Sequence, residues 1–338
     1  MNFEPWYNKN YKKLLIIPAI VLALSLIYIG IFYIQNGDII NKDVSLTGGT
    51  TITIQTQISA QDLETEISKT LTDFEITTIS NNAGAQIQLA IIVGEQNTET
   101  LESVLENFLD YELTSDNGVS KETTSASLSE DFYKQLIVAV LIAFFWMAAV
   151  VFLIFSTGKK TKFWVIVLNI LLGFFMGNFF LTANPVISAI IFIAFAATLV
   201  YIYIKNSIPS FAVMLSAFAN IIMALAIVDL IGIKISTAGI VAFLMLIGYS
   251  VDTDILLTTR MLKKHEETNK ALFRAFKTGT TMTITSIIAI TAALIVVFPF
   301  ASVLNQIFTI LLIGLGFDLF NTWITNASII KWYVEESK

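Results

Sequence analysis

Long apolar stretches recur along the chain, each about 19 to 22 residues long and almost free of charged side chains. Because an α-helix rises about 1.5 Å per residue, a stretch of this length crosses a hydrocarbon core about 30 Å thick. The pattern predicts about eight membrane-spanning helices, over residues 14–34, 135–155, 163–182, 186–204, 210–228, 237–257, 280–298 and 303–324.

The composition agrees with this pattern. The 338 residues are 55% hydrophobic and only 14% charged, and the mean hydropathy is +0.74, which is typical of an integral membrane protein. The stretch 14–34 is too long for the core of a signal peptide and ends in bulky residues, so we expect a retained anchor. The absence of cysteine excludes disulfides, thiolate metal sites and cysteine nucleophiles.

Residues 38–131 are long and polar enough to form a domain outside the membrane. Alternating and helical spacings of apolar residues follow one another here, with Asn82 and Gly84 as a hairpin signal. The predicted order is strand, helix, strand, strand, helix, strand, over residues 43–56, 58–72, 74–82, 85–93, 97–109 and 119–128. This order is typical of an α+β ferredoxin-like domain, a four-stranded sheet with two helices on one face.

Lysine and arginine indicate the orientation. With a cytoplasmic N terminus and eight spans, 15 of the 20 basic residues fall on the cytoplasmic side, and the exceptions are Lys42, Lys69, Lys121, Lys134 and Lys234. The positive-inside rule therefore predicts that both termini are cytoplasmic and that residues 38–131 are extracytoplasmic. That segment carries 17 acidic residues against three lysines, so an acidic outer surface is expected opposite a basic inner one.

The connection between the sixth and seventh apolar stretches, residues 258–279, is basic and contains Arg260, Arg274 and Lys277. It is amphipathic in part, so we expect it to lie on the cytoplasmic surface of the membrane. It also holds the single histidine of the chain, His265, beside two glutamates. One histidine cannot build a zinc site, so a solvated surface role is expected.

Two acids interrupt the sixth apolar stretch. Asp252 and Asp254 are expected in the inner third of the bilayer, where a charged carboxylate costs about 2.5 to 3.5 kcal/mol unless it faces the bundle interior, finds a partner or is protonated. Two positions turn a helix by about 200°, so the acids cannot both face one partner. Asp254 shares a polar stripe with Ser250 and Thr258, which slightly favours it as the inward group. Asp252 shares another face with Gly248, where glycine permits close helix approach.

Further polar residues lie in other spans. Asp318 is in the last stretch, before Asn321 and Asn326, and Asn220 is in the fifth. Three acids without an intramembrane base indicate protonatable groups rather than permanent ion pairs, because an apolar environment disfavours a charged carboxyl. The proton-relay candidates are Asp254, Asp252 and Asp318, with the supporting polar groups Ser250, Thr253, Thr258 and Asn220. The alternative is a polar cluster that only fixes helix packing.

The sequence indicates no catalytic residue, metal site, cofactor or nucleic-acid contact. The motif LTGGT contains Gly48 and Gly49 but lacks both the lysine of a P-loop and the spacing of GxGxxG. An active transporter without a nucleotide site must use an ion gradient or a partner.

Taken together, these features resemble the SecF family, the smaller partner in the SecD and SecF protein-export complex of the resistance-nodulation-division superfamily. That family places a glycine pair at the start of the first outer strand, here Gly48 and Gly49, and then a ferredoxin-like domain. A GYS-plus-acid motif follows, here GYSVDTD, then a basic link and a helix start like KTGTTMTIT. VDTDILLTTR and DLFNTWITNASIIKWY resemble the archaeal branch. The motifs cover residues 10–56 and about 205–335.

The resemblance implies a non-enzymatic subunit that assists polypeptide translocation across the cytoplasmic membrane, its outer domain moving as the membrane part cycles. In bacterial relatives the energy source is the proton gradient. The implied partners are a SecD-like subunit, the Sec translocon channel, the exported polypeptide and membrane lipid, with no nucleic acid and no cofactor.

Three departures from the family pattern have consequences. Family members usually have six spans, whereas residues 135–204 here include an added hairpin, over about 156–204, before the core at 205–330. Asn220 stands where relatives commonly carry an acid. This difference weakens the argument that the proton relay of those relatives operates through the same positions in this chain. In bacterial relatives the acid after GYS falls at the position of Thr253, between the two acids of this chain.

Two other functions remain as alternatives at the level of sequence. GLGFD resembles the GxGD motif of intramembrane aspartyl proteases, but its acid, Asp318, comes one residue late. An exporter of lipids or small molecules from the same superfamily usually carries two domains and about twelve spans in one chain, more than this sequence has.

Overall fold

The computed structural model describes residues 3–72, 74–80, 86–180, 185–263, 267–298 and 302–336. Within these ranges eight helical segments are long and apolar enough to cross a membrane, and each coincides with one predicted stretch. The protein is therefore a mostly helical, multi-pass membrane protein. The segments are Trp6–Asn36, Leu128–Phe155, Lys159–Asn178, Val186–Asn206, Ile208–Ile231, Thr237–Met261, Thr268–Val297 and Val303–Glu336.

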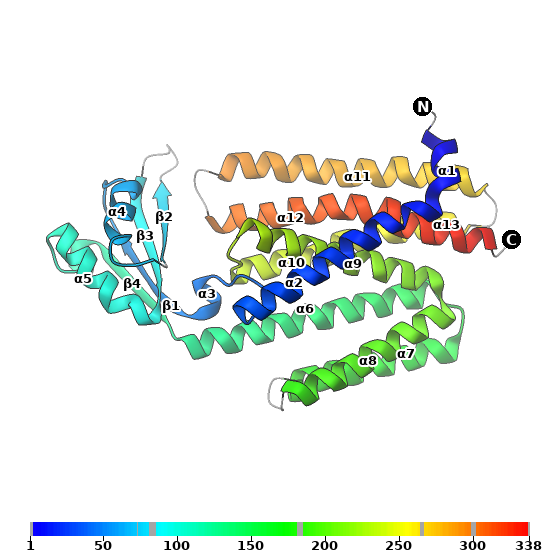
Figure 1. Ribbon diagram of the computed structural model, residues 1–338, viewed down its shortest axis with the longest axis horizontal. Helices are drawn as coiled ribbons and strands as arrows, with labels where there is room; N and C mark the ends of the chain where they lie inside the picture. Colours follow the sequence, from blue (N-terminus) through cyan, green and yellow to red (C-terminus); the bar gives the residue numbers. More distant parts are fainter. Residues whose placement is uncertain are drawn as a thin grey trace.

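The long helices run side by side, with a small sheet at one end of the bundle and both chain termini at the other (Figure 1). Their bounds are α1 (Phe3–Leu14), α2 (Ile16–Asn36), α6 (Ala126–Phe155), α7 (Lys159–Phe175), α8 (Pro185–Asn206), α9 (Ile208–Ile231), α10 (Thr237–Met261), α11 (Thr268–Val297), α12 (Ser302–Asn321) and α13 (Ala327–Glu336). The described residues also contain two π-helical turns, η3 (Met176–Phe180) after α7 and η4 (Thr322–Asn326) between α12 and α13.

Helices α9, α10 and α12 form the centre of the bundle. In the apolar part of α9, 67% of residues are buried, against 6% in α2 and in α11, which lie at the periphery. Small residues let the central helices approach closely: a Cβ added at Gly314 of α12 would lie 2.4 Å from the Leu246 side chain of α10. This packing brings the polar residues of three helices into one buried volume.

Helices α7 and α8 form a hairpin on one flank of the bundle (Figure 1). They pack on α6, where the ring of Phe152 stacks on Tyr203 with 4.9 Å between centroids. Phe145 of α6 also meets Phe192 of α8 edge to face at 5.7 Å. Aromatic contacts therefore hold this hairpin against the rest of the membrane part.

The small domain is a four-stranded antiparallel sheet in the order β2-β3-β1-β4. Two helices cover it through an apolar core that includes Ile52, Leu63, Leu89 and Leu105. The strands are β1 (Gly49–Ile54), β2 (Phe74–Ser80), β3 (Gln86–Gly94) and β4 (Val119–Thr124), and the covering helices are α4 (Ala60–Ile67) and α5 (Thr98–Leu109), with short 3₁₀ turns η1 (Glu95–Asn97) and η2 (Ser115–Asn117).

The predicted element order of this domain is present, with one local difference. The first strand was expected to begin at residue 43, but Val44–Thr47 form a short helix, α3. Gly48 follows it with φ +82°, a conformation that glycine adopts at little cost, and β1 begins at Gly49. The hairpin residues Asn82 and Gly84 lie outside the described residues.

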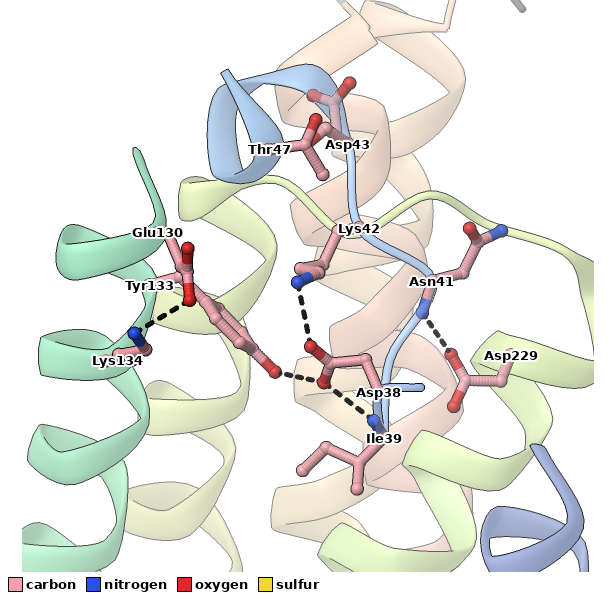
Figure 2. A network of polar contacts seen from close by, with 10 residues as sticks. All are labelled: Asp38, Ile39, Asn41, Lys42, Asp43, Thr47, Glu130, Tyr133, Lys134 and Asp229. Atoms are coloured by element: carbon pink, nitrogen blue, oxygen red, sulfur yellow. Dashed lines mark hydrogen bonds and ion pairs between the residues drawn. The ribbon is translucent and has the colours of Figure 1, made fainter. Parts of the chain in front are cut away.

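The segment between α2 and the sheet is tied to the membrane bundle by polar contacts (Figure 2). Residues 41 and 43 exchange backbone hydrogen bonds with Ile235, at 2.6 and 3.0 Å. The amide of Asn41 donates to Oδ1 of Asp229 at the end of α9, at 3.1 Å. The hydroxyl of Tyr133 on α6 donates to Oδ1 of Asp38, at 2.6 Å. We call residues 38–43 the tether, because they fix the sheet domain to α6 and α9.

At the opposite end of the bundle, the prediction that residues 258–279 lie on the membrane surface is wrong for the part from residue 268 onward. Residues 268–279 are the first turns of α11, one continuous helix from Thr268 to Val297. Ala271, Leu272 and Ala275 are buried, in a cluster with Tyr7 of α1 and Ile330 of α13. Apolar contacts with α1 and α13 therefore hold this segment in line with the rest of α11. His265 lies outside the described residues.

Candidate functional site

A buried polar cluster lies in the centre of the bundle. Asp254 of α10 and Asp318 of α12 are 0% and 1% exposed, and the two helices that carry them pack against each other. Asn220 of α9 joins them and is also fully buried. The cluster therefore connects the three central helices.

Asn220 organises the part of the cluster around Asp318. Its side-chain amide donates to Oδ1 of Asp318 at 3.1 Å and to the hydroxyl of Ser250 at 2.5 Å. Its own carbonyl oxygen accepts a 2.7 Å hydrogen bond from Asn321. Thr322 donates to the same Asp318 oxygen at 3.4 Å. The hydrogen-bond partners of this carboxyl are thus neutral amide and hydroxyl groups. An ion pair would need a basic side chain in their place.

Asp254 is held from the other side by Asn326. The side-chain amide of Asn326 donates to Oδ1 of Asp254 at 2.9 Å and lies 3.5 Å from the hydroxyl of Thr258. Neither Oδ2 of Asp254 nor Oδ2 of Asp318 has a hydrogen-bond partner among the described residues. A buried oxygen without a donor is costly when charged, so each of these oxygens is a suitable place for a proton.

The backbone of the last span brings these groups together. The π-helical turn η4 widens the helix at residues 322–326. As a result Asn321, Thr322, Thr325 and Asn326 are all at most 6% exposed and face the cluster region. Single π-helical turns inside α-helices frequently occur at functional sites.

The structure separates the two acids of α10. Asp254 is buried, as are Ser250 and Thr258 of its predicted stripe, whereas Asp252 is exposed. The expected inward orientation of Asp254 is therefore present. Asp252 is not part of the cluster.

Gly248 also lies on the exposed face of α10, and a Cβ added there would meet nothing within 4 Å. The predicted close approach at Gly248 is therefore wrong for contacts within this chain. The close approach occurs instead at Gly279, where an added Cβ would lie 2.7 Å from Trp323 and 2.9 Å from Thr253. Thr253 is thus buried against α11.

The remaining predicted residues lie outside the cluster. Arg260, at the end of α10, donates to the carbonyl oxygen of Arg274 and to the hydroxyl of Thr278 on α11, at 2.9 and 3.0 Å. Arg274 and Lys277 are exposed. Gly48 and Gly49 shape the entry into β1. None of these residues is brought to the acids.

The sequence patterns missed several members of the cluster region. Ser216 of α9 is buried one turn before Asn220, and Thr322 and Thr325 are buried in η4. Hydroxyl residues are common in membrane helices because they can bond to their own backbone, so each is a weak signal alone. The informative signal is spacing, since Ser216 and Thr322 each stand four residues from a predicted cluster member.

A second polar region lies between the sheet domain and the bundle. A cavity of about 530 Å³ separates β2 from the connection that follows α9 and from the start of α12, and Asp43, Glu75 and Lys234 line it. Partial burial raises the pKa of the Glu75 carboxyl, with a further increase from Asp43 and a decrease from Lys234. Within the described residues no group of three His, Cys, Asp or Glu side chains is arranged to hold a metal ion.

Known proteins show similarity along nearly the whole chain. The family model described as "Protein export membrane protein SecD/SecF, C-terminal" matches residues 176–336. The protein-export membrane protein SecF of Methanocaldococcus jannaschii is 33% identical over 333 residues, which cover 97% of each protein. SecF of Pyrococcus furiosus is 30% identical over 326 residues, covering 96% of this chain and 91% of that protein.

The matched range begins at residue 176, inside the hairpin predicted as an addition, so the similarity extends further toward the N terminus than the motifs indicated. Among solved structures, SecDF from Thermus thermophilus, described as a translocon-associated membrane protein, aligns with all of this chain at a TM-score of 0.54 and 14% identity. This chain spans 39% of the length of that protein. The alignment establishes a shared fold.

Proposed function

This chain belongs to the SecD/SecF family of protein-export membrane proteins as a SecF-like subunit, and we propose from that premise that its buried acids couple proton movement to polypeptide export. In this mechanism Asp254 and Asp318 take up and release a proton, and the helices that carry them shift. The motion passes to the sheet domain, which acts on the exported polypeptide. The role is that of a non-enzymatic translocase subunit.

The observation that carries the proposal is the burial of two carboxyls in one polar cluster, with no basic side chain bonded to either among the described residues. Two like charges cannot share a volume of low dielectric without a large cost, so the pair favours holding at least one proton. Removal of that proton changes which amides and hydroxyls can bond to Asp318 and Asp254. Because Asn220, Ser250 and Asn326 belong to three different segments, such a change alters their packing.

The route from the cluster to the sheet domain follows α9. Asn220 lies in its middle and Asp229 near its end, where Asp229 accepts a hydrogen bond from the tether. The tether also meets α6 through Tyr133 and Asp38. A shift of α9 relative to α6 therefore moves the attachment of the domain. The cavity beside Glu75 leaves space for that movement.

The exposed face of α10 is the surface that we expect a SecD-like partner to contact. Gly248 and Asp252 lie on this face with the apolar side chains of Met245 and Tyr249, which are 42% and 46% exposed. An acid that faces lipid within the hydrocarbon core is costly, whereas the interior of a larger bundle accommodates it. We assign this face to the contact with a SecD-like subunit. The Sec translocon channel and the exported polypeptide are the further partners in the proposal.

The sheet domain is proposed to be ferredoxin-like and extracytoplasmic. The strand order and the two covering helices support the first assignment, and the distribution of lysine and arginine supports the second. Because the chain lacks cysteine, a single cysteine at Asn117 or at Lys160 is labelled without background. An impermeant thiol reagent should reach Asn117 from outside and Lys160 from inside. Outside labelling of Lys160 would contradict the eight-span orientation.

Export of a secreted reporter in cells that depend on this chain tests the coupling. Asp254→Asn and Asp318→Asn keep the size and hydrogen bonding of each side chain but remove its ionisation. We expect normal amounts of assembled complex and a loss of export stimulation. Asp116→Asn, an exposed acid of the sheet domain, is the matched control and should export normally. Full export by both variants would leave the acids as packing groups.

A further inference from the structure

A large apolar cavity lies on the flank of the bundle, away from the buried acids. Its volume is about 480 Å³, within the range of about 300 to 1,000 Å³ that small-molecule sites occupy. The wall is formed by α6, α8, α9 and the start of α10, together with the tether. Representative lining residues are Phe144, Phe145, Phe192, Ala196, Phe218 and Ile40.

The chemistry of this lining excludes a polar occupant. Apart from backbone, the lining side chains are aliphatic, aromatic or thioether groups. Water requires two to four polar partners to be held in a cavity, and these walls do not offer them. The cavity is nevertheless not sealed, since Phe218 is 38% exposed and Ile39 is 37% exposed. Because the surrounding helices span the membrane, the medium at this opening is hydrocarbon.

One end of the cavity meets a group of charged residues. Ile39 and Ile40 line it, and Asp38 and Lys42 flank them in the tether (Figure 2). On α6, Ile137 lines it one turn after Tyr133 and Lys134. Lysine and tyrosine are characteristic of the boundary between the hydrocarbon core and the headgroups. This end of the cavity therefore lies at headgroup level.

The two lysines at this end can bind an anionic group. Lys42 pairs with Asp38 at 2.8 Å and its side chain is 24% exposed, while Lys134 pairs with Glu130 at 2.7 Å and is 46% exposed. An ammonium group has three donors, so one carboxylate leaves others available. Lys42 also lies over the ring of Tyr133, at 4.7 Å from its centroid, which fixes its position beside the opening.

We propose that one hydrocarbon chain of a bilayer phospholipid occupies this cavity, with its phosphate beside Lys42 and Lys134. The apolar length then matches the apolar walls, and at the headgroup end each lysine keeps N–H donors beyond those used by its carboxylate partner. Helix α8 supplies Phe192 and Ala196, so the hairpin of α7 and α8 acquires a role as the outer wall of a lipid site. This inference is independent of proton coupling.

Photolabelling tests the site directly. The full-length chain, with its co-purifying partner, is reconstituted into vesicles of phosphatidylethanolamine and phosphatidylglycerol, with a trace of phosphatidylglycerol that carries a diazirine in one acyl chain. After irradiation, labelled residues are mapped by mass spectrometry. We expect label on Phe144 and Phe145 inside the cavity, besides label on outward residues such as Ile193, which is 62% exposed.

Two tryptophan variants on the same helix separate cavity binding from general lipid contact. Ala196→Trp places an indole in the cavity and should remove most of the label from Phe144 and Phe145. Ile193→Trp faces outward and should leave that label unchanged. Monodisperse elution and retained label on Ile190 report folding, and Val200→Phe replaces Ala196→Trp if the larger residue prevents folding.

Three results would overturn the proposal. The first is label confined to outward residues in the unmodified protein. The second is undiminished cavity label in a folded Ala196→Trp or Val200→Phe variant. The third is cavity label that appears in the isolated chain and disappears when the partner is bound, which would assign the cavity to a partner segment.

Discussion

The side-chain amide of Asn326 donates a 2.9 Å hydrogen bond to Oδ1 of Asp254, across 72 positions of the chain. This contact joins η4 of the last span to α10 and fixes the orientation of a fully buried carboxyl. Thr258 and Asp254 are on the same stripe of α10, and Asn326 reaches both. The acid is therefore positioned by a different helix from the one that carries it.

Asn326→Ala should destabilise the bundle. The change removes the donor to Oδ1 of Asp254, and interhelical hydrogen bonds in membranes contribute about 1 to 2 kcal/mol. Thermal unfolding of the purified complex in mild detergent measures the effect. Asn206→Ala is the control, because Asn206 is exposed and bonds to the carbonyl oxygen of Ile202 in its own helix. Equal melting temperatures for the two variants would show that the Asn326 contact is energetically neutral.

A matched pair of glycines in α12 tests the close packing of the central helices. Gly314→Ala should destabilise the protein by about 1 to 3 kcal/mol, because the new methyl group would overlap Leu246. Gly316→Ala lies two residues later in the same helix, where an added Cβ meets nothing within 4 Å, and should be neutral or slightly stabilising. The comparison uses thermal unfolding at one pH. A reversed order of stability would contradict the described contact between α10 and α12.

Glu75→Gln should stabilise the protein at neutral pH. Partial burial, and then Asp43, raise the pKa of Glu75 above its ordinary value of 4.5. The folded state thus prefers the neutral carboxyl, so the glutamate lowers the free energy of unfolding at pH 7. The penalty should disappear as pH falls through the folded-state pKa toward 4.5. Unfolding of both proteins at pH 7 and pH 4.5 measures this, with exposed Glu99→Gln as the control. A difference that grows on acidification would refute the prediction.

Gly248→Leu should weaken binding of the SecD-like partner without unfolding the chain. Gly248 lies on the exposed face of α10, and the space around it is open within the chain, so a leucine meets no internal contact. If this face is the interface, the leucine side chain at position 248 would clash with the SecD-like partner. The measurement is the amount of partner recovered in mild detergent. Gly30→Leu, on the exposed face of α2, is the control. Equal recovery would remove α10 from the interface.

The spans were predictable from the sequence because a segment of about 20 apolar residues has few alternatives to crossing a membrane. The inward position of Asp254 was also predictable, since Ser250 and Thr258 mark its face of the helix. Helical spacing alone does not reveal where an α-helix contains a π-helical turn. The residues of η4 reach the cluster because of a π-helical turn, and nothing in TWITN distinguishes that turn from a regular helix.

Contacts between helices were predicted less well than the helices themselves. Gly248 was expected at a close approach because it is small, but Gly279 and Gly314 hold that position. Glycine in a membrane helix permits an approach without specifying the neighbour. The basic segment 258–279 was expected on the membrane surface because it is amphipathic in part. Its apolar side chains pack against α1 and α13, and tertiary contacts decided its direction.

Sensitivity of export to the proton gradient is the most direct test of whether Asp254 and Asp318 couple proton movement to export. In vesicles made from cells, the completed export of a secreted reporter is measured with and without a protonophore, for the unmodified chain and for the Asp254→Asn, Asp318→Asn double variant. We expect the double variant, present in a normal amount of complex, to export as poorly as the unmodified chain does with the protonophore, and we expect the protonophore to cause no further loss through this subunit. Export by the double variant at the unmodified rate, with undiminished sensitivity to the protonophore, would contradict proton coupling by these two acids.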